Sequence, residues 1–455
     1  MALPSTGAIS LSAIQTEFGG ANPIAINEYY AGGVYVPAGT TGTNGAVPSS
    51  GTIDFNVFHG TAAGFTYWQQ EQSSNTYFSL ASVGFDSSDN YYSAMNGSTN
   101  GATFNKVASL GANQFTRRFT TGQYTRMVTT AAGNSYITGV SGTVGTIVKY
   151  NSSGVLQWQR SISCAGGSAY CEGICLDASE NVYVGGWDQA GASMFIMSFT
   201  SAGTQRWVRN ILPAVAPDAR INLTSFASGT GIAYSFVVGS GSGGANQICA
   251  GTYDTAGVVI GQIALASPTR SLTNNYMGFT SLGSDFLFGF TTYNNSFTAT
   301  YQEYLTYNTA IGWQKELNSG GLGNFVEAVS TDGTAYYSAG RSDSSTGPAF
   351  AKLNATTGSI IAQRYISGGP STGTSGVTAG STQLALGSQR YTVASYMYKA
   401  PLNMSFGLST SLTSATSDFV AGTVAVTDSA GTQTSSTSTR TEAAFAGSYT
   451  LTQLT

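Results

Sequence analysis

One pattern of hydrophobic and polar positions repeats seven times between Tyr92 and Leu386. Each repeat has a short polar turn, an aromatic or apolar strand, and a later strand built around Trp or a replacement. The residue six positions after the start of the turn is usually aromatic. The aligned positions are Tyr92, Tyr136, Tyr183, Tyr234, Phe288, Tyr336 and Leu386. Their spacing of about 44 to 54 residues, with strand-like sequence throughout, predicts the blades of a β-propeller.

A second strand marker follows most aligned positions by about two dozen residues. It reads LQWQR (156–160) or QRWVR (205–209), and a turn such as NSSG (151–154) precedes it. Small polar residues and Gly suit a hairpin turn at this point. Each repeat is therefore roughly four strands, and radial stacking of the repeats buries the Tyr and Trp positions between neighbouring blades.

One strand of the second kind, TYWQQ (66–70), has no earlier strand of its own repeat before it. We predict that residues 65–71, around Trp68, supply the outer strand of the last blade, whose other strands come from about 374–411. Closing the ring in this way removes exposed sheet edges. The propeller then covers residues 65–411 and has seven blades, with six or eight as alternatives.

Two segments carry the repeat most clearly, IVKYNSSGVLQWQR (147–160) and LDASENVYVGGW (176–187). They resemble a bacterial β-propeller repeat that combines the stretches D-x-S-G-N-x-Y-V-x-G and K-Y-N-S-x-G-x-x-x-W. The fourth, fifth and seventh blades fit that repeat poorly. The resemblance covers about three quarters of the chain and implies a mainly β propeller, but it implies little about function.

The first 60 residues follow a different pattern, in which apolar, x, apolar, Ser or Asn, x, apolar occurs three times. The three copies begin at Ile9, Ile24 and Ile53. In each copy we expect a short extended pair that leads into Ser12, Asn27 or Asn56 as the N-cap of a brief helix. Glycines after each copy keep the helices short. Residues 36–51, between the second and third copies, are expected to be loop.

This stretch, ISLSAIQTEFGGANPIAINEYYAGG and then VPSSGTIDFNVFHG, is similar to an N-terminal module of many tailed-bacteriophage virion proteins. The similarity covers residues 3–60 and is the most specific family signal in the chain. It implies that residues 1–64 attach the protein, in multiple copies, to other virion tail proteins of a particle assembled in the host bacterial cytoplasm. The alternative is an ordinary N-terminal cap packed on the propeller. The residues expected to carry the attachment are Ile9, Leu11, Ile14, Ile26, Tyr29, Tyr30, Phe55 and Phe58.

Residues 412–455 carry very little charge. Alternation of apolar and polar residues in 419–427 and 448–454 predicts two strands. The polar run 434–441 between them is either a third strand or a loop. We expect a small C-terminal β appendage, or an end that becomes ordered only in an assembly.

Composition narrows the class of protein. Charged residues make up 8% of the chain, against about 25% in ordinary soluble domains. With 17 basic residues and a net charge of −4, the chain lacks a phosphate-binding footprint, so no nucleic-acid partner is expected. No apolar run approaches the length of a membrane span, and the N-terminus lacks the features of a secretory signal. An adhesin-like surface of low charge without an export signal fits a bacteriophage virion protein.

Few residues are suited to catalysis. His59 is the only histidine, which excludes a Ser-His-Asp or Cys-His triad in the propeller, and we expect it to be structural. Several aspartates fall in the repeated turns, where Asp caps its own backbone. The best acid candidates are Glu172, Glu303, Glu316 and Glu327. Nothing in the sequence pairs them at the roughly 5 to 10 Å that a glycosidase needs, so no enzymatic activity is expected.

The four cysteines do not read as a zinc site, because Cys164, Cys171 and Cys175 have no histidine or fourth close cysteine. A disulfide between Cys164 and Cys171 would close the loop that they flank, whereas a reducing cytosol favours free thiols. Cys175 alternates with apolar residues and is expected in the core, and Cys249 stands apart. Turns such as DASEN (177–181) lack the ligand series of a calcium-binding loop. We therefore expect no metal and no cofactor.

Three classes of function remain. The first is a non-enzymatic virion protein, such as part of a tail fiber, whose propeller displays a face for a host-surface glycan or protein. The second is a purely structural decoration or collar protein, and the third is a depolymerase that cuts host polysaccharide. Loops at the blade ends are the expected contact sites. Aromatic side chains suited to stacking on sugars there are Trp187, Tyr276, Tyr293 and Tyr301.

Overall fold

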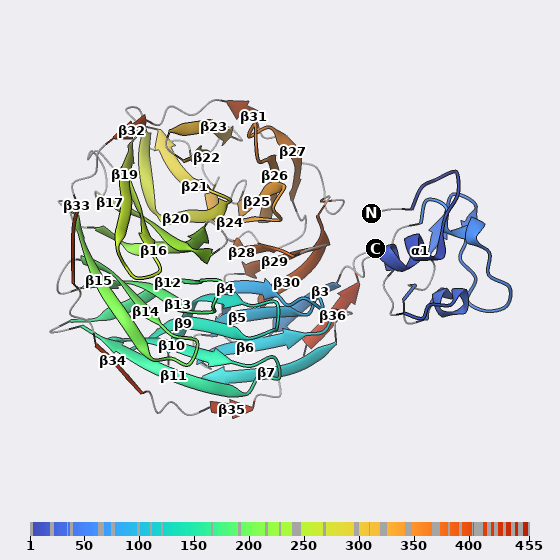
Figure 1. Ribbon diagram of the computed structural model, residues 1–455, viewed down its shortest axis with the longest axis horizontal. Helices are drawn as coiled ribbons and strands as arrows, with labels where there is room; N and C mark the ends of the chain where they lie inside the picture. The colour runs from blue at the N-terminus through green and yellow to red at the C-terminus, as the bar shows by residue number, and fades with distance from the viewer. Residues whose placement is uncertain are drawn as a thin grey trace. The chain divides into compact units, whose positions relative to one another are not determined.

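The structure is a computed structural model of the chain, shown in Figure 1. Two compact units divide it, Met1–Tyr67 and Trp68–Leu454, close to the predicted boundary at residue 64. The structure describes residues 3–453 except 19–21, 34, 37–39, 62–67, 74–77, 98–100, 110–111, 120–121, 165–166, 190–192, 214–216, 227–228, 239–246, 267–269, 295–299, 309, 319–324, 342–347, 366–373, 381–382, 391–393, 403, 405–412, 416–419, 423–425, 431–433, 438–441 and 445–448.

The N-terminal unit has a short helix in each copy of its sequence pattern. The helices are α1 (Leu11–Phe18), η1 (Ile26–Tyr29) and η2 (Phe55–Phe58). Each begins at the third position of the pattern. The predicted N-caps Ser12, Asn27 and Asn56 were wrong, because these residues already lie inside the helices.

The N-cap is instead the residue at the second position of the pattern. Asp54 is still extended, with φ −116° and ψ 143°, and its carboxylate accepts a hydrogen bond from the Asn56 backbone N–H at 2.9 Å. In the first copy, the Ser10 hydroxyl accepts from the Ala13 backbone N–H at 3.0 Å. An extended residue just before the first turn can fold its side chain back onto the free N–H groups, which a residue inside the helix cannot do.

The prediction that residues 36–51 are loop was wrong in part. They contain a short hairpin of β1 (Thr41–Gly42) and β2 (Gly45–Ala46). Gly45 has a φ of +115°, which favours glycine. The Asn44 side chain donates to the Asn56 side-chain oxygen at 2.9 Å, so the hairpin is held against η2. The Asn44–Gly45 dipeptide is a strong hairpin signal that the sequence interpretation passed over.

The second unit is a seven-bladed β-propeller, as predicted (Figure 1). The first strands of the blades are β4 (Phe78–Phe85), β8 (Gln123–Thr129), β12 (Ala169–Leu176), β16 (Pro217–Phe226), β20 (Arg270–Leu282), β24 (Phe325–Thr331) and β28 (Thr374–Ala379). The second strands are β5 (Tyr91–Gly97), β9 (Ser135–Ser141), β13 (Val182–Asp188), β17 (Gly231–Val238), β21 (Asp285–Asn294), β25 (Ala335–Arg341) and β29 (Gln383–Arg390). The third strands are β6 (Gly101–Val107), β10 (Val144–Tyr150), β14 (Ser193–Phe199), β18 (Gln247–Asp254), β22 (Thr300–Tyr307), β26 (Pro348–Asn354) and β30 (Ala394–Pro401). The fourth strands of blades 1 to 6 are β7 (Asn113–Phe119), β11 (Leu156–Ser163), β15 (Gln205–Pro213), β19 (Val259–Ala266), β23 (Ile311–Asn318) and β27 (Ile360–Tyr365).

The ring closes as predicted. The fourth strand of blade 7 is β3 (Trp68–Ser73), which pairs with β30 so that Glu71 lies opposite Tyr396. A strand from the start of the propeller therefore completes the blade made by its last strands. The side chain of Trp68 lies outside the described residues.

The seven aligned sequence positions all lie in second strands, but they fall on two different faces. Tyr92, Tyr136 and Tyr183 pack against the next blade. Tyr234, Phe288, Tyr336 and Leu386 pack against the preceding blade. In blades 4 to 7 the residues that face the next blade are Ala233, Leu287, Tyr337 and Ala385. The alignment was wrong by one residue there, because both faces of a blade are buried and a one-residue slip exchanges them.

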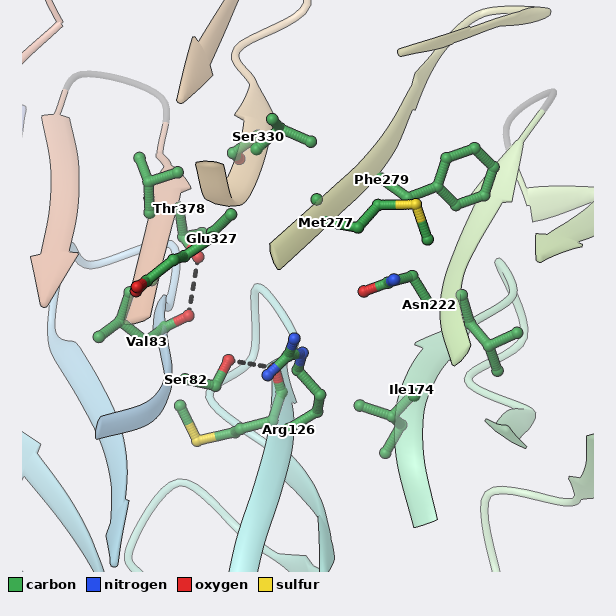
Figure 2. A pocket seen from close by; sticks show the side chains of 18 residues that line it. Ser82, Val83, Arg126, Ile174, Asn222, Met277, Phe279, Glu327, Ser330 and Thr378 are labelled. Atoms are coloured by element: carbon green, nitrogen blue, oxygen red, sulfur yellow. Dashed lines mark hydrogen bonds between the residues drawn. The ribbon is translucent and has the colours of Figure 1, made fainter. Parts of the chain in front are cut away.

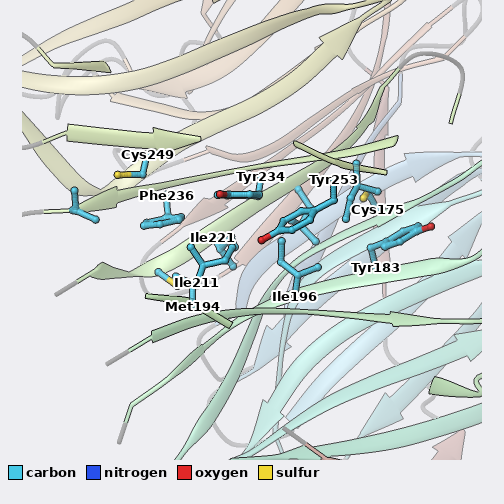
Figure 3. Packing of buried hydrophobic residues seen from close by; sticks show 13 residues of the cluster. Cys175, Tyr183, Met194, Ile196, Ile211, Ile221, Tyr234, Phe236, Cys249 and Tyr253 are labelled. Carbon is cyan, nitrogen blue, oxygen red and sulfur yellow. The ribbon is translucent and has the colours of Figure 1, made fainter. Parts of the chain in front are cut away.

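The Trp positions join each blade to the next one. Trp207 of blade 3 packs on Gly257 in the last turn of blade 4, and its indole N–H donates to the Thr255 carbonyl at 3.1 Å. Trp158 and Trp313 make the same contacts with Gly203 and Gly358. Between blades 3 and 4 the core is a dense apolar cluster that includes Tyr183, Ile196 and Tyr234 (Figure 3). These contacts explain why Trp recurs in the fourth strands of blades 2, 3 and 5.

The C-terminal tail does not form an appendage of its own. Its six short strands each add a fifth strand to the outer edge of a blade, at the rim of the ring in Figure 1. The strands are β31 (Thr413–Ala415), β32 (Val420–Gly422), β33 (Val426–Ala430), β34 (Thr434–Thr437), β35 (Glu442–Ala444) and β36 (Tyr449–Gln453). They pair in turn with β23, β19, β15, β11, β7 and β3. The tail thus passes backward around the ring, and only blade 6 has four strands among the described residues.

Candidate functional site

The seven first strands surround the centre of the propeller, and each one has a shift in register with its second strand. In blade 3 the shift falls between Cys171 and Gly173, and in blade 6 it falls between Val326 and Ala328. The other first strands shift at corresponding places. A bulge of this kind turns a side chain away from the regular alternation of the sheet. Glu172 and Glu327 are the extra residues of two of these bulges.

Hydroxyl groups link neighbouring first strands to one another around this centre. Ser82 Oγ donates to the Met127 carbonyl at 3.0 Å, and Thr378 Oγ1 donates to the Val83 carbonyl at 2.7 Å (Figure 2). Thr125 donates in the same way to the carbonyl of Cys171. These bonds hold the first strands, which have no sheet partner on their inner side, at a fixed separation.

A cavity of about 180 Å³ lies between the first strands of all seven blades. Its polar lining includes Ser82, Arg126, Asn222 and Glu327, and Met277 adds an apolar patch (Figure 2). The Arg126 guanidinium and the Asn222 amide both point toward the middle of this space in Figure 2. Pockets that hold drug-sized ligands measure roughly 300–1,000 Å³, so this cavity suits a smaller molecule.

Four charged groups from four different blades act on one another here. They are Arg126 on β8, Glu172 on β12, Arg220 on β16 and Glu327 on β24. Burial, and then repulsion by Arg220, lower the pKa of Arg126, although Glu172 and Glu327 act in the opposite direction. Burial likewise raises the pKa of Glu172, against the attraction of Arg126 and Arg220. The two carboxylates therefore offset only part of the cost of placing Arg126 in the channel.

The structure separates the four predicted acid candidates into two places. Glu327 lines the central cavity, and Glu172 interacts electrostatically with Arg126 of the same cavity. The sequence could not indicate this, because both glutamates lie at bulges. Glu303 and Glu316 lie in blade 5, buried and directly opposite each other on β22 and β23. The Glu303 carboxylate accepts a hydrogen bond from Thr292 Oγ1 at 3.1 Å. This second pair is part of the blade interior.

The structure describes the side chains of two of the four predicted sugar-stacking residues, Trp187 and Tyr293. Trp187 is half-buried, stacks on Tyr170 at 5.7 Å between ring centroids, and packs against the core between blades 3 and 4. Tyr293 is partly buried on β21. The side chains of Tyr276 and Tyr301 lie outside the described residues. For Trp187, the structure favours a core role over a display role.

The apolar residues expected to attach the N-terminal unit mostly build its own core. Ile14, Tyr29 and Phe58 are fully buried there. Ile9, Leu11 and Ile26 are partly buried against that core, and Tyr30 is also partly buried. Phe55, which is 37% exposed, is the large apolar side chain of this group that faces solvent.

His59 is buried, and its Nδ1 donates to the Pro4 carbonyl at 3.0 Å, which ties the end of the N-terminal unit to its beginning.

Cys164, Cys171, Cys175 and Cys249 are all buried free thiols. Burial raises the pKa of the Cys249 thiol to about 12, which makes it unreactive at neutral pH. Within the described ranges, no group of three or more His, Cys, Asp or Glu residues is placed to hold a metal ion.

The turn aspartates have the structural role that the sequence predicts. Asp177 Oδ1 accepts from the backbone N–H groups of Ser179 and Asn181, both at 2.9 Å, and its other oxygen accepts from the Tyr183 hydroxyl at 2.8 Å. Asp86 makes the corresponding contacts in blade 1.

Across the described part of the chain, no helix has the length and apolar character of a membrane span.

No protein family and no curated protein matches this sequence. Solved structures that share the propeller fold include Kuenenia stuttgartiensis hydrazine synthase, at 10% identity over 74% of this chain and 95% of that one, with a TM-score of 0.47. The Dos1 propeller matches at 10% identity over 70% and 77%, with a TM-score of 0.41. The polysaccharide lyase Uly1 matches at 7% identity over 71% and 90%, with a TM-score of 0.45. Likeness at this level carries no argument about function.

Proposed function

We propose that this chain is a non-enzymatic, tail-associated bacteriophage virion protein. Its N-terminal unit attaches it to the particle, and its propeller displays a surface for a host glycan or protein. The observation that carries this proposal is that Met1–Tyr67 is a compact unit with a core of its own residues. The same segment carries the sequence similarity to the phage module. The ring is closed by its own strands, and the N-terminal unit has its own core. The unit is therefore better suited to attach the protein to a partner than to serve as a cap on the propeller.

The attachment surface in this proposal differs from the residues that build the unit. Ile14, Tyr29 and Phe58 are buried, so they give the unit its shape and are not free to contact a partner. Phe55 is the exposed apolar candidate. Large apolar side chains in solvent are common at protein contacts when polar residues surround them.

Particle assembly tests the attachment. A chain that begins at Trp68 keeps every propeller strand and should fold, but it should be absent from purified particles. Phe55→Ser should lower occupancy, whereas Ile260→Ser, which alters an apolar residue on the propeller that is even more exposed, should leave occupancy unchanged. Normal occupancy of the chain that begins at Trp68 would show that the attachment surface is elsewhere.

We also propose that the protein catalyses no reaction. The only histidine of the sequence, His59, lies in the N-terminal unit, so the propeller has no imidazole to act as a general acid or base. Purified protein should leave host polysaccharide at its original length. Release of reducing ends that Glu327→Gln abolishes would establish the depolymerase instead.

The purely structural alternative differs only in having no ligand. Binding of the full-length protein to host cells, and to an array of host-surface glycans, separates the two. A virion protein that occupies the particle normally and binds neither would be a decoration or collar component.

A further inference from the structure

Arg126 has more hydrogen-bond donors than the described protein groups use. A guanidinium carries five N–H donors. Among the described residues its one hydrogen bond runs from Nη1 to the Thr125 carbonyl, at 3.0 Å. The side chain is partly buried and lines the central cavity. Donors in such a place require acceptors, and water or a ligand in the cavity is the available source.

Asn222 is the second polar side chain directed into the same space (Figure 2). It lies on β16 opposite Ser235 of β17 and is partly buried, and its side chain makes no hydrogen bond with the described residues. An amide offers two donors and an acceptor, which is the combination that recognises a hydroxyl group. Arg126 and Asn222 come from blades 2 and 4, so the closed ring is what brings them together.

The charges around the cavity limit what it can hold. Arg126 and Arg220 repel each other, and a negative group bound to Arg126 would offset that repulsion. Glu172 and Glu327 already carry negative charge nearby, which disfavours a ligand with several charges such as phosphate. One carboxylate satisfies both conditions, and its two oxygens match the paired donors of a guanidinium.

We propose that the central channel binds a small hydroxylated carboxylate, held by Arg126 at its carboxylate and by Asn222 at a hydroxyl. The size of the cavity, about 180 Å³, limits the ligand to one small unit, such as a uronic acid. Such a unit occurs free or at the end of an acidic glycan. The glycan source rests on the proposed display function, whereas binding of the unit itself does not.

Titration calorimetry of the full-length protein with glucuronate, glucose, acetate and inorganic phosphate tests the chemistry. Glucuronate should bind, and glucose, which lacks the carboxylate, should bind about 10- to 100-fold more weakly. Acetate, which lacks the hydroxyls, and phosphate should also bind more weakly than glucuronate. Equal binding of all four, or no binding of glucuronate, would overturn the proposal.

Variants assign the binding to the two side chains. Arg126→Lys keeps the charge but loses the paired donors, and should weaken glucuronate binding about 10-fold or more. Asn222→Ala should reduce the preference for glucuronate over acetate. Lys315→Gln removes one positive charge from the outer strand β23 and serves as the matched control, with binding unchanged. If Arg126→Lys shows a wild-type circular dichroism spectrum and binds glucuronate normally, Arg126 is not the carboxylate site.

Acidic glycans and host cells separate this inference from the display function. If a glycan that ends in glucuronate binds as tightly as free glucuronate, the glycan is the natural source. If only the free acid binds, the ligand is a small metabolite and the glycan source is excluded. Host-cell binding that Arg126→Lys leaves intact would overturn the channel as the receptor site while supporting display elsewhere. Glucuronate binding without host-cell binding would support the channel and contradict display.

Discussion

Met404 belongs to the apolar cluster between blades 6 and 7, and Ala362 packs against that cluster, at the two positions that hold a glycine and a tryptophan between other blades. Trp158, Trp207 and Trp313 lie on Gly203, Gly257 and Gly358 in the last turn of the next blade. Those glycines have positive φ, and Met404 has a φ of +57° and is fully buried. The small and large residues are therefore exchanged across this one interface, and the backbone keeps the same left-handed turn.

A double-mutant cycle measures this exchange. Met404→Gly should lower the free energy of unfolding by about 1–3 kcal/mol, because lost side-chain packing exceeds the relief of the left-handed backbone. Ala362→Trp should also destabilise, since Met404 fills the space that the indole needs. The double variant should be more stable than the sum of the two changes predicts, by about 1 kcal/mol or more. Additive effects in denaturant unfolding would show that the two residues do not act as a pair.

A pair of glycine substitutions isolates the contact between tryptophan and the turn. A Cβ added at Gly257 would meet the Trp207 ring at 2.8 Å, where φ is +82°. Gly283 has a φ of +62° but open space around it. Gly257→Ala should destabilise by about 1–3 kcal/mol more than Gly283→Ala, because both share the backbone cost and only the first displaces a ring. Equal thermal unfolding midpoints would contradict the packing role of Trp207.

The turn aspartates should make the propeller sensitive to acid. Burial alone raises the pKa of Asp177, but hydrogen bonds from Asn181, Tyr183 and Ser179 outweigh it and leave that pKa below its ordinary value. As the pH falls, the carboxylate of Asp177 therefore takes up a proton in the unfolded state before it does so in the folded state. Its contribution to the free energy of unfolding is complete above about pH 4 and is lost as the pH falls through the lower, folded pKa.

Asp177→Asn should therefore flatten the decline in stability below about pH 4, and Tyr183→Phe should give an intermediate slope. Urea unfolding at a series of pH values supplies the slopes. A wild-type slope in Asp177→Asn would mean that other carboxylates carry the acid sensitivity.

Removal of the C-terminal tail should make the propeller associate with itself. A chain that ends at residue 412 lacks all six tail strands, so the outer strands of six blades lose their partners. Unpaired strand edges pair readily with other chains. Sedimentation should show oligomers for this chain, and fewer for a chain that lacks only Tyr449–Gln453, which uncovers one blade. A monomeric chain ending at residue 412 would show that the tail does not protect these edges.

The fold was predictable because its signals are local and repeated. Trp158 and Trp207 mark outer strands, Asp177 marks a turn, and the surplus strand at Trp68 indicates ring closure. The position of each residue on a face was less certain, since Tyr336 and Tyr337 are adjacent and both buried, and sequence alone does not say which faces the next blade.

The channel was not predictable from the same signals. Arg126 and Asn222 are single residues in strands 96 positions apart, without a shared motif, and only the closed ring brings them to one cavity. Glu172 and Glu327 are the extra residues of two bulges, and no turn residue in the sequence marks these bulges. The pairing of the tail strands with the blades was not predicted. Each tail strand has only three to five residues, and each pairs with a different blade.

Strand β3 has a mechanical consequence for a propeller held at its N-terminal side. It is the first strand after the link at Tyr67, yet it lies inside its sheet, with β30 on one side and β36 on the other. Tension on that link therefore reaches two ladders of hydrogen bonds at once, including Glu71 opposite Tyr396 and Gln70 opposite Leu451. A strand loaded along two ladders resists extraction more than an edge strand does. In single-molecule pulling from residue 67, deletion of Tyr449–Gln453 should lower the force at which the ring opens.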